Sequence, residues 1–282
     1  MTQVKLYLDY AGYCTAKESH AIKGGSNKII KFHALFGLIQ HPVHGWILYD
    51  TGYTRRFYEA TSRFPNNIYA AFTKVTIEEA DEVKVKLKNY GISTSDINHV
   101  IITHFHADHI GGLKDFEHAN IYCLKAAYEQ FKNINPLLAF TRGILKSMVP
   151  LDVESRLRII EDYCTPESDE ILGIKYDLFN DTSIYLTPLE GHAAGQVGVL
   201  VSTQKHSYFL IADACWLKKS YEEMILPSPL VKLFFSSWKK YKSSLQKVHQ
   251  FHKSYPGYII VPTHCYETTS KIVYNNQQVN EL

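Results

Sequence analysis

The stretch THFHADHIGG, residues 103–112, decides the fold of this chain. Three histidines and one aspartate stand within the six positions from 104 to 109. A His-x-His-x-Asp-His pattern arises by chance only about once in several hundred chains of this length and composition, so it indicates a metal site. The alternative is a solvated turn that happens to be rich in histidine.

The spacing within this stretch has a mechanical meaning. Residues two apart in an extended backbone point the same way, so His104 and His106 can bind one ion together. If the chain turns at Ala107, Asp108 and His109 face a second ion close by. Two glycines follow at 111 and 112, and they let the backbone pass close to the site.

Four further donors stand at or just beyond the ends of apolar, strand-like runs. They are Asp50 in WILYD (46–50), His192 in SIYLTPLEGH (183–192), Asp213 in SYFLIAD (207–213) and His264 in GYIIVPTH (257–264). Open sheets with helices on their faces collect their chemistry on the loops beyond one edge of the strands. Each donor alone would more often be a hydrogen-bonded structural residue or a helix cap, so the prediction rests on the set.

The donors divide into two sets of three with one carboxylate between them: His104, His106 and His192 for the first ion, Asp108, His109 and His264 for the second, and Asp213 as the bridge. Bridged pairs of ions in such sites lie ~3.5–4 Å apart, with a hydroxide between them as the nucleophile. Nitrogen and oxygen donors without thiolate fit two zinc ions, and they also accommodate Mn²⁺, Fe²⁺ or Co²⁺.

Two acidic residues are given further roles. Asp50 is expected to orient a ligand histidine through the free N–H of its ring, with a strand-end cap as the alternative. Asp108 is a candidate proton shuttle once the substrate bond opens, so Asp108 and Asp213 are the predicted catalytic carboxylates. The neighbouring thiols of Cys215 and Cys265 are interpreted as buried filler, with a ligand or nucleophile role as the alternative.

Strand-like and helix-like segments alternate along the chain. Strands are expected near 5–8, 29–40, 46–50, 99–103, 183–189, 207–213 and 257–263, with a hairpin turn at 41–45. A helix is expected over 76–91, with a capping box at Thr76 and Glu79 and an end at Gly91. A second helix over 236–252 carries aromatic residues on one face and lysines elsewhere. It is interpreted as an outer helix with its aromatics packed inward, the alternative being a nucleic-acid patch.

The segment 113–182 has a mostly helical pattern and separates the strand-like runs that precede and follow it, so we expect a helical cap insertion. No Gly/Ser-rich or Pro-rich linker divides the sequence, which favours a single domain over 1–282.

The composition excludes several classes of protein. The net charge is +2, which points to neither nucleic acid nor a membrane as a partner. No signal-like start and no apolar run of ~20 residues are present. Five scattered cysteines are poor material for a disulfide framework, so a reduced, cytoplasmic protein is expected.

The ordered motifs LYDTGY, THFHADHIGG, EGHAAGQVG, IADACW and VPTHC resemble the metallo-β-lactamase superfamily over roughly residues 29 to 265. Within it the chain is most similar to the N-acyl homoserine lactone lactonases, which act in quorum quenching. The resemblance implies an α/β fold, a four-layer αββα sandwich, with a dinuclear metal site at one edge. It places the family's ligand roles on the seven residues already assigned.

One position departs from the lactonases. They carry a tyrosine three residues after the bridging aspartate, where its hydroxyl helps to polarise the lactone carbonyl, and here that residue is Trp216. An indole offers a donor N–H but no hydroxyl, so the assistance is altered. Trp216 and Phe105 are expected to line an apolar pocket for the substrate.

The sequence therefore predicts a metal-dependent hydrolase that opens a small-molecule lactone or ester of the N-acyl homoserine lactone type. Three alternatives stay open: a glyoxalase II-like thioester hydrolase, a phosphodiesterase, and a non-catalytic metal-binding protein. The oligomeric state is open, a dimer included.

Overall fold

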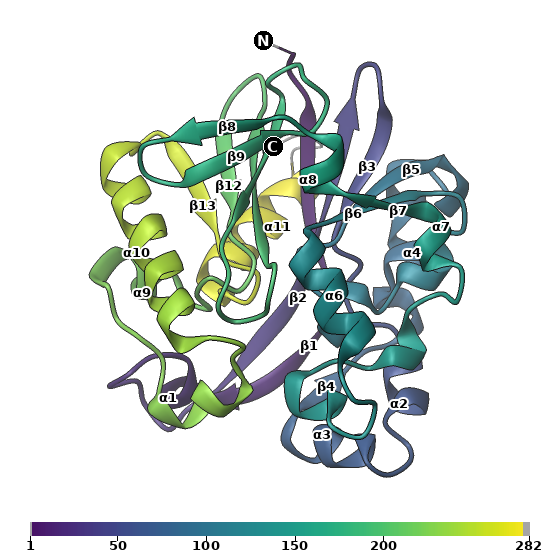
Figure 1. The fold of residues 1–282 in the computed structure, drawn as a ribbon, viewed down its shortest axis with the longest axis vertical. Helices are drawn as coiled ribbons and strands as arrows, with labels where there is room; N and C mark the ends of the chain where they lie inside the picture. Colours follow the sequence, from purple (N-terminus) through teal and green to yellow (C-terminus); the bar gives the residue numbers. More distant parts are fainter. Residues whose placement is uncertain (1, 279–282) are drawn as a thin grey trace.

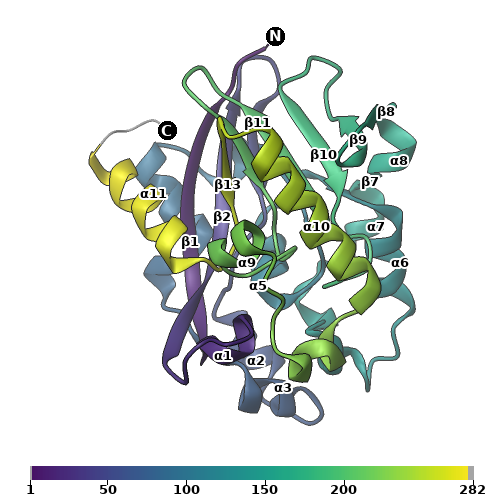
Figure 2. The same cartoon turned by 90° about the vertical axis from the view of Figure 1, so that its left-hand side faces the viewer.

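Two β-sheets pack face to face, and helices cover their outer faces (Figures 1 and 2). The computed structural model describes residues 2–278. The first sheet has the strand order β4 (Lys74–Thr76), β1 (Lys5–Lys17), β2 (Ile29–His41), β3 (Gly45–Tyr49), β5 (Ile97–Ile101), β6 (Asn120–Cys123) and β7 (Leu157–Ile159). The second has the order β13 (Tyr258–Val261), β12 (Ser207–Leu210), β11 (Val197–Ser202), β10 (Ile184–Pro188), β9 (Gly173–Asp177) and β8 (Pro166–Asp169).

The α-helices are short, except for α10 and α11. They are α1 (Glu18–Ala21), α2 (Arg56–Ala60), α3 (Asn66–Phe72), α4 (Val83–Lys86), α5 (Ala107–Ile110), α6 (Lys125–Asn133), α7 (Val153–Arg156), α8 (Ile160–Tyr163), α9 (Lys218–Glu223), α10 (Trp238–Ser254) and α11 (Tyr266–Gln278). Short 3₁₀ helices lie between them: η1 (Glu79–Asp81), η2 (Leu87–Tyr90), η3 (Thr94–Asp96), η4 (Leu113–Asp115), η5 (Ala139–Arg142), η6 (Lys146–Met148) and η7 (Pro229–Phe234). No helix within residues 2–278 is long and apolar enough to cross a membrane.

Strand β2 shows how the sequence produces the layers. Leu35 and Ile39 belong to the core between the two sheets, whereas Phe36 and Leu38 belong to the core under the outer helices. Successive side chains of a strand point to opposite faces, so a strand that is covered on both sides reads as one continuous apolar run. This confirms the predicted αββα sandwich.

Most predicted elements are present. The turn at 41–45 closes a hairpin in which Gln40 pairs with Trp46 and His41 with Gly45. Helix α10 buries Tyr241, Leu245 and Val248, as the pattern predicted, and Trp238 on the same face is partly buried. Its partners across the outer face of the second sheet include Phe209 and Ile260.

The helix predicted over 76–91 is wrong at its start. Thr76 belongs to β4, and the capping box is formed by Glu78 and Asp81 in front of the 3₁₀ turn η1. The segment then continues as α4 and η2 and ends at Gly91, whose φ of 71° matches the predicted terminating glycine.

The helical pattern predicted for 113–182 is only partly present. This segment carries α6, α7 and α8, but it also supplies β6 and β7 to the first sheet and β8 and β9 to the second. These strands have three to five residues each, and β8, with the sequence PESD, is exposed over most of its length. The edge strand β8 is short and polar and has no apolar alternation, which is why the sequence pattern did not indicate it. Strand β6 is buried between β5 and β7, but its four residues are too few to show a period.

The topology brings the predicted donors to one edge. Strands β3 and β5 run parallel, as do β12 and β13, and donors follow the ends of all four. His192 lies in the turn between the antiparallel strands β10 and β11, at the same edge.

Gly191 lets this turn pack against α10. Its φ is 128°, and a Cβ there would lie 2.0 Å from the backbone nitrogen of Tyr241. The Gly191 carbonyl accepts a hydrogen bond from the Ser237 backbone N–H at 3.0 Å, which fixes the residue before His192.

We expect Gly191→Ala to lower the free energy of unfolding by roughly 2–4 kcal/mol, because the new methyl group meets backbone and the φ is unfavourable for alanine. Gly257→Ala is the matched control: nothing lies within 4 Å of its Cβ position. It should change stability by no more than about 0.5 kcal/mol. Urea unfolding of both variants checks this, and equal midpoints would contradict it.

Candidate metal centre

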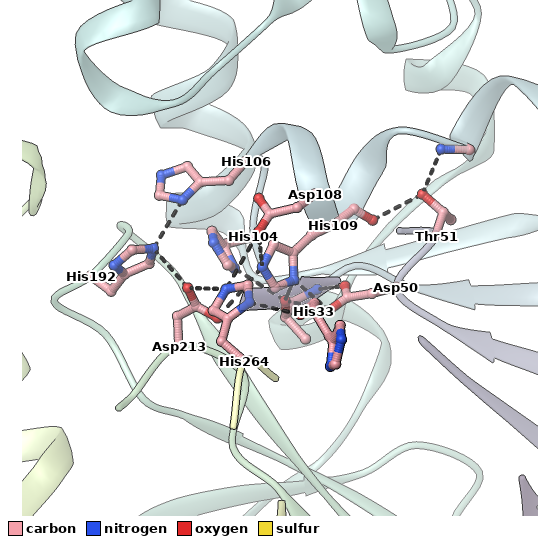
Figure 3. Close-up of polar contacts among 12 residues, drawn as sticks. His33, Asp50, Thr51, His104, His106, Asp108, His109, His192, Asp213 and His264 are labelled. Atoms are coloured by element: carbon pink, nitrogen blue, oxygen red, sulfur yellow. Dashed lines mark hydrogen bonds and ion pairs between the residues drawn. The ribbon is translucent and has the colours of Figure 1, made fainter. Parts of the chain in front are cut away.

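Seven predicted donors converge in a buried cluster (Figure 3). They are His104, His106, Asp108, His109, His192, Asp213 and His264. The Asp213 carboxylate lies at the middle: its Oδ2 is 3.0 Å from His264 Nε2 and 3.2 Å from His192 Nε2, and its Oδ1 is 3.5 Å from His109 Nε2. His106 joins through its Nδ1, which is 2.9 Å from His192 Nε2.

The donor atoms form three overlapping groups, in each of which they lie within 4.8 Å of one another. These groups are His104, His106 and His192; Asp108, His109 and His264; and His104, His109 and Asp213. The first two coincide with the two sets that the sequence spacing suggested. The third places Asp213 between them.

Several of these atoms are buried without a hydrogen-bond partner among the described residues. They include His104 Nε2, His109 Nε2 and Asp213 Oδ1. Leaving such atoms unpaired away from water costs about 1–3 kcal/mol each, more for charged groups. Because they are imidazole nitrogens and a carboxylate oxygen aimed at one another, the residues present fit divalent cations.

Three of the histidines are held in the neutral form that binds metal. Burial, together with neighbouring imidazoles, lowers the pKa of His106 and of His192 to about 3. The same causes lower the pKa of His104 well below its usual value. Their lone pairs are therefore available at neutral pH.

The histidines near the carboxylates behave in the opposite way. Burial alone would lower the pKa of His109, but Asp50 and Asp108 raise it well above its usual value. Asp213 raises the pKa of His264 in the same way, against the effect of burial. Burial opposes the charge of Asp213 itself, yet His264 and His192 hold its pKa well below the ordinary range. Asp213 is therefore an anion at the centre.

Asp50 fixes the His109 ring through the ring nitrogen that faces away from the cluster. Its Oδ2 accepts hydrogen bonds from His109 Nδ1 at 2.7 Å and from Thr103 Oγ1 at 2.9 Å, and its Oδ1 accepts one from the Thr103 backbone N–H. Asp50 has a φ of 52°, a left-handed conformation that directs the carboxylate to this position. Bonding at Nδ1 leaves Nε2 to face the cluster, which is the arrangement of a metal ligand.

Two supporting contacts were not predicted. His264 Nδ1 donates to the backbone carbonyl of His33 at 2.8 Å, and Thr51 donates to the carbonyl of His109 through both its N–H and its hydroxyl. A backbone acceptor leaves no trace in side-chain patterns. Thr51, directly after Asp50, could have been noticed as a polar residue at a strand end.

Trp216 and Phe105 have different surroundings. The Trp216 indole N–H donates to Asp213 Oδ2 at 3.0 Å, so this side chain borders the cluster. Phe105 is buried in the core of the first sheet's outer layer, where it stacks on Phe131 with ring centroids 4.8 Å apart. The expectation that Phe105 lines a substrate pocket is therefore not supported: its side chain points to the opposite side from its histidine neighbours.

Comparisons with known proteins identify the family of this chain. The family model described as the metallo-beta-lactamase superfamily matches residues 32–264. The chain belongs to the metallo-beta-lactamase superfamily. The N-acyl homoserine lactonase of Bacillus cereus is 24% identical over 226 residues, covering 80% of this chain and 81% of the relative. N-acyl homoserine lactonase AiiB of Agrobacterium fabrum (strain C58) is 25% identical, covering 62% of this chain and 60% of the relative.

Solved structures share the fold. An N-acyl homoserine lactone hydrolase, solved with N-hexanoyl-L-homoserine bound at its catalytic metal centre, aligns with a TM-score of 0.73 at 21% identity, covering 96% of this chain and 97% of that one. AidC, described as a dizinc quorum-quenching lactonase, aligns with a TM-score of 0.65 at 14% identity, covering 94% and 89%. These relatives confirm the predicted class, a metal-dependent hydrolase.

We expect Asp50→Asn to weaken zinc binding by about 10–100-fold. The asparagine NH₂ can donate to His109 Nδ1, which places the ring proton on Nε2, where the ion would bind. The control is Asp181→Asn, since Asp181 accepts from His41 Nε2 at 2.8 Å outside the cluster. Competition with a chromophoric chelator measures both affinities; a loss of equal size in the two variants would contradict the role given to Asp50.

Zinc binding should release protons at pH 7, because His109 and His264 have raised pKa values and must deprotonate at Nε2. The affinity for zinc of the donor group that contains His109 and His264 should therefore rise with pH. His106 and His192 have pKa values of about 3, so they contribute no such dependence at neutral pH. Calorimetry in buffers of different ionisation enthalpy measures the release. Zinc uptake with no proton released would contradict this prediction, because it would show that His109 and His264 are neutral before zinc binds.

Proposed function

We propose that this protein is a dinuclear metal-dependent hydrolase that opens a lactone or ester of the N-acyl homoserine lactone type. The observation that carries the proposal is the pair of donor groups sharing Asp213: the two sets of three lie on either side of one buried carboxylate. A structural role requires no such pair. The lactonases among its relatives support the substrate class.

In this proposal the seven donors are the ligands. His104, His106 and His192 would hold one ion, Asp108, His109 and His264 would hold the other, and the Asp213 carboxylate would be shared by the two sets. Two zinc ions bound there would supply Lewis-acid chemistry: they would lower the pKa of water toward neutrality and would polarise the substrate carbonyl. The zinc assignment is supported by the nitrogen and oxygen donor set and by the dizinc relative.

The chain's own residues position and protect this chemistry. Asp50 and the His33 carbonyl fix the rings of His109 and His264 from behind. Asp108 Oδ2 lies 3.4 Å from His264 Nε2, and its side chain keeps a small exposed fraction of 11%. We therefore assign to Asp108 the transfer of a proton to the leaving oxygen, because it combines contact with the centre and access from solvent.

Trp216 sets this chain apart from the lactonase pattern. Its N–H is committed to Asp213 Oδ2, so it does not polarise a substrate carbonyl as a tyrosine hydroxyl would. Its ring lies against Phe32 and Phe235, with centroids 6.0 and 5.5 Å away, and forms an apolar wall beside the centre. We infer that this wall contacts the acyl part of the substrate.

We propose that the chain acts as one domain, which the shared core between the sheets supports. We propose a cytoplasmic location, which the five free cysteines support.

Turnover by the zinc-loaded protein should be fastest on acyl homoserine lactones, in a panel that also holds an aryl ester, a glutathione thioester and a bis-aryl phosphate. Asp213→Ala should lose at least one ion per chain and nearly all activity, because one carboxylate serves both groups. The matched control is Asp9→Ala, since Asp9 contacts Lys86 at 2.9 Å outside the cluster.

Metal analysis and initial rates give the two readouts. Fast thioester or phosphodiester cleavage with silent lactones would replace the proposed substrate class. Full metal content with no turnover of any substrate would favour a binding protein.

A further inference from the structure

Three segments form one surface around the metal centre, and we call them the rim: residues 61–77, 134–146 and 224–239. They include α3, η5 and η7, which lie at the same end of the molecule in both views, opposite the N-terminus (Figures 1 and 2). Hydrogen bonds join the segments 134–146 and 224–239 to each other and to the centre, and in the segment 61–77 helix α3 lies next to η5. Arg142 Nη1 donates to the carbonyls of Leu233 and Phe235, Ser236 N–H donates to the carbonyl of His192, and Ala107 N–H donates to the carbonyl of Gly143.

The rim exposes large apolar side chains. Phe64 precedes α3 and is 76% exposed, Phe72 ends α3 and is 78% exposed, and Leu233 on η7 is 80% exposed. The others are Leu137, Leu138, Leu230 and Phe234, each at least half exposed. Scattered exposed apolar residues are ordinary, but a group on neighbouring segments beside one site indicates a surface that contacts something apolar.

The rim also carries only one sign of charge. None of the chain's 28 acidic residues lies in the three segments, which contain Arg63, Lys74, Arg142, Lys146, Lys232 and Lys239. Four of these, Arg63, Lys74, Lys232 and Lys239, are exposed, and none of the four has an ion-pair partner within residues 2–278. The net charge of +2 for the whole chain therefore conceals a cationic end.

We propose that the rim docks on an anionic phospholipid surface and opens the metal centre toward it. Leucine and phenylalanine side chains insert into the interface, while lysine and arginine contact the lipid phosphates. Charge favours this partner over a second copy of the chain, because a two-fold contact through the rim would bring its cations face to face. It also revises the expectation from net charge that no membrane is involved. Docking itself is independent of the proposed function; only the delivery of a lipid-dissolved acyl substrate rests on that function.

Sedimentation with vesicles tests the docking without any substrate. Phosphatidylcholine vesicles with about 30% phosphatidylglycerol should retain the metal-loaded protein, and pure phosphatidylcholine should retain at least tenfold less. The double variants Leu233→Ser/Phe234→Ser and Lys232→Glu/Lys239→Glu should each lose at least tenfold in binding, and added salt should weaken the wild type.

The matched controls change similar residues near strand turns outside the rim. Val43→Ser, at a position 79% exposed, and Lys205→Glu should bind vesicles as the wild type does. Thermal unfolding and zinc content of all variants confirm that the fold is intact.

Lack of binding to either kind of vesicle would overturn the proposal, as would equal loss in rim and control variants. A rim-dependent shift in molecular mass, or retention on single-stranded RNA in place of vesicles, would identify a second copy or a nucleic acid instead.

Discussion

The buried carboxylate of Asp213 is the constraint on which the rest of the site depends. It is an anion out of contact with water, and such a charge is stable only when other groups compensate for it. Imidazoles from three separate segments of the chain surround it: His109 from helix α5, which follows β5, His192 from the turn after β10 and His264 from the loop after β13. The αββα arrangement brings these segments to one edge.

The sheets also explain why the histidine-rich stretch works as a site. Parallel pairing of β3 with β5 places Asp50 behind His109, so one sheet supplies both a ligand and the group that fixes its tautomer. Alternation after β5 sends His104 and His106 to the centre and Phe105 into the core. Two of these three consecutive residues therefore supply donors to the centre, and the residue between them anchors the segment in the core.

Side chains that end apolar strands could be predicted from the sequence, because burial and chemistry both leave a residue-type signature. Donors carried by the backbone could not, and the His33 carbonyl under His264 is the example. The edge strand β8 could not be predicted for a related reason. It pairs with β9 through backbone hydrogen bonds, and its exposed side chains follow no period. The Trp216 contact with Asp213 depends on a rotamer that sequence does not encode. The net charge of the whole chain could not predict the cationic rim either, because the rest of the chain carries more acidic than basic residues.

Anomalous diffraction at the zinc edge, from crystals grown with zinc, would locate the bound ions. We expect two peaks about 3.5–4 Å apart, with the Asp213 carboxylate between them and three further protein donors at each. A single peak, or peaks away from these seven side chains, would contradict this expectation.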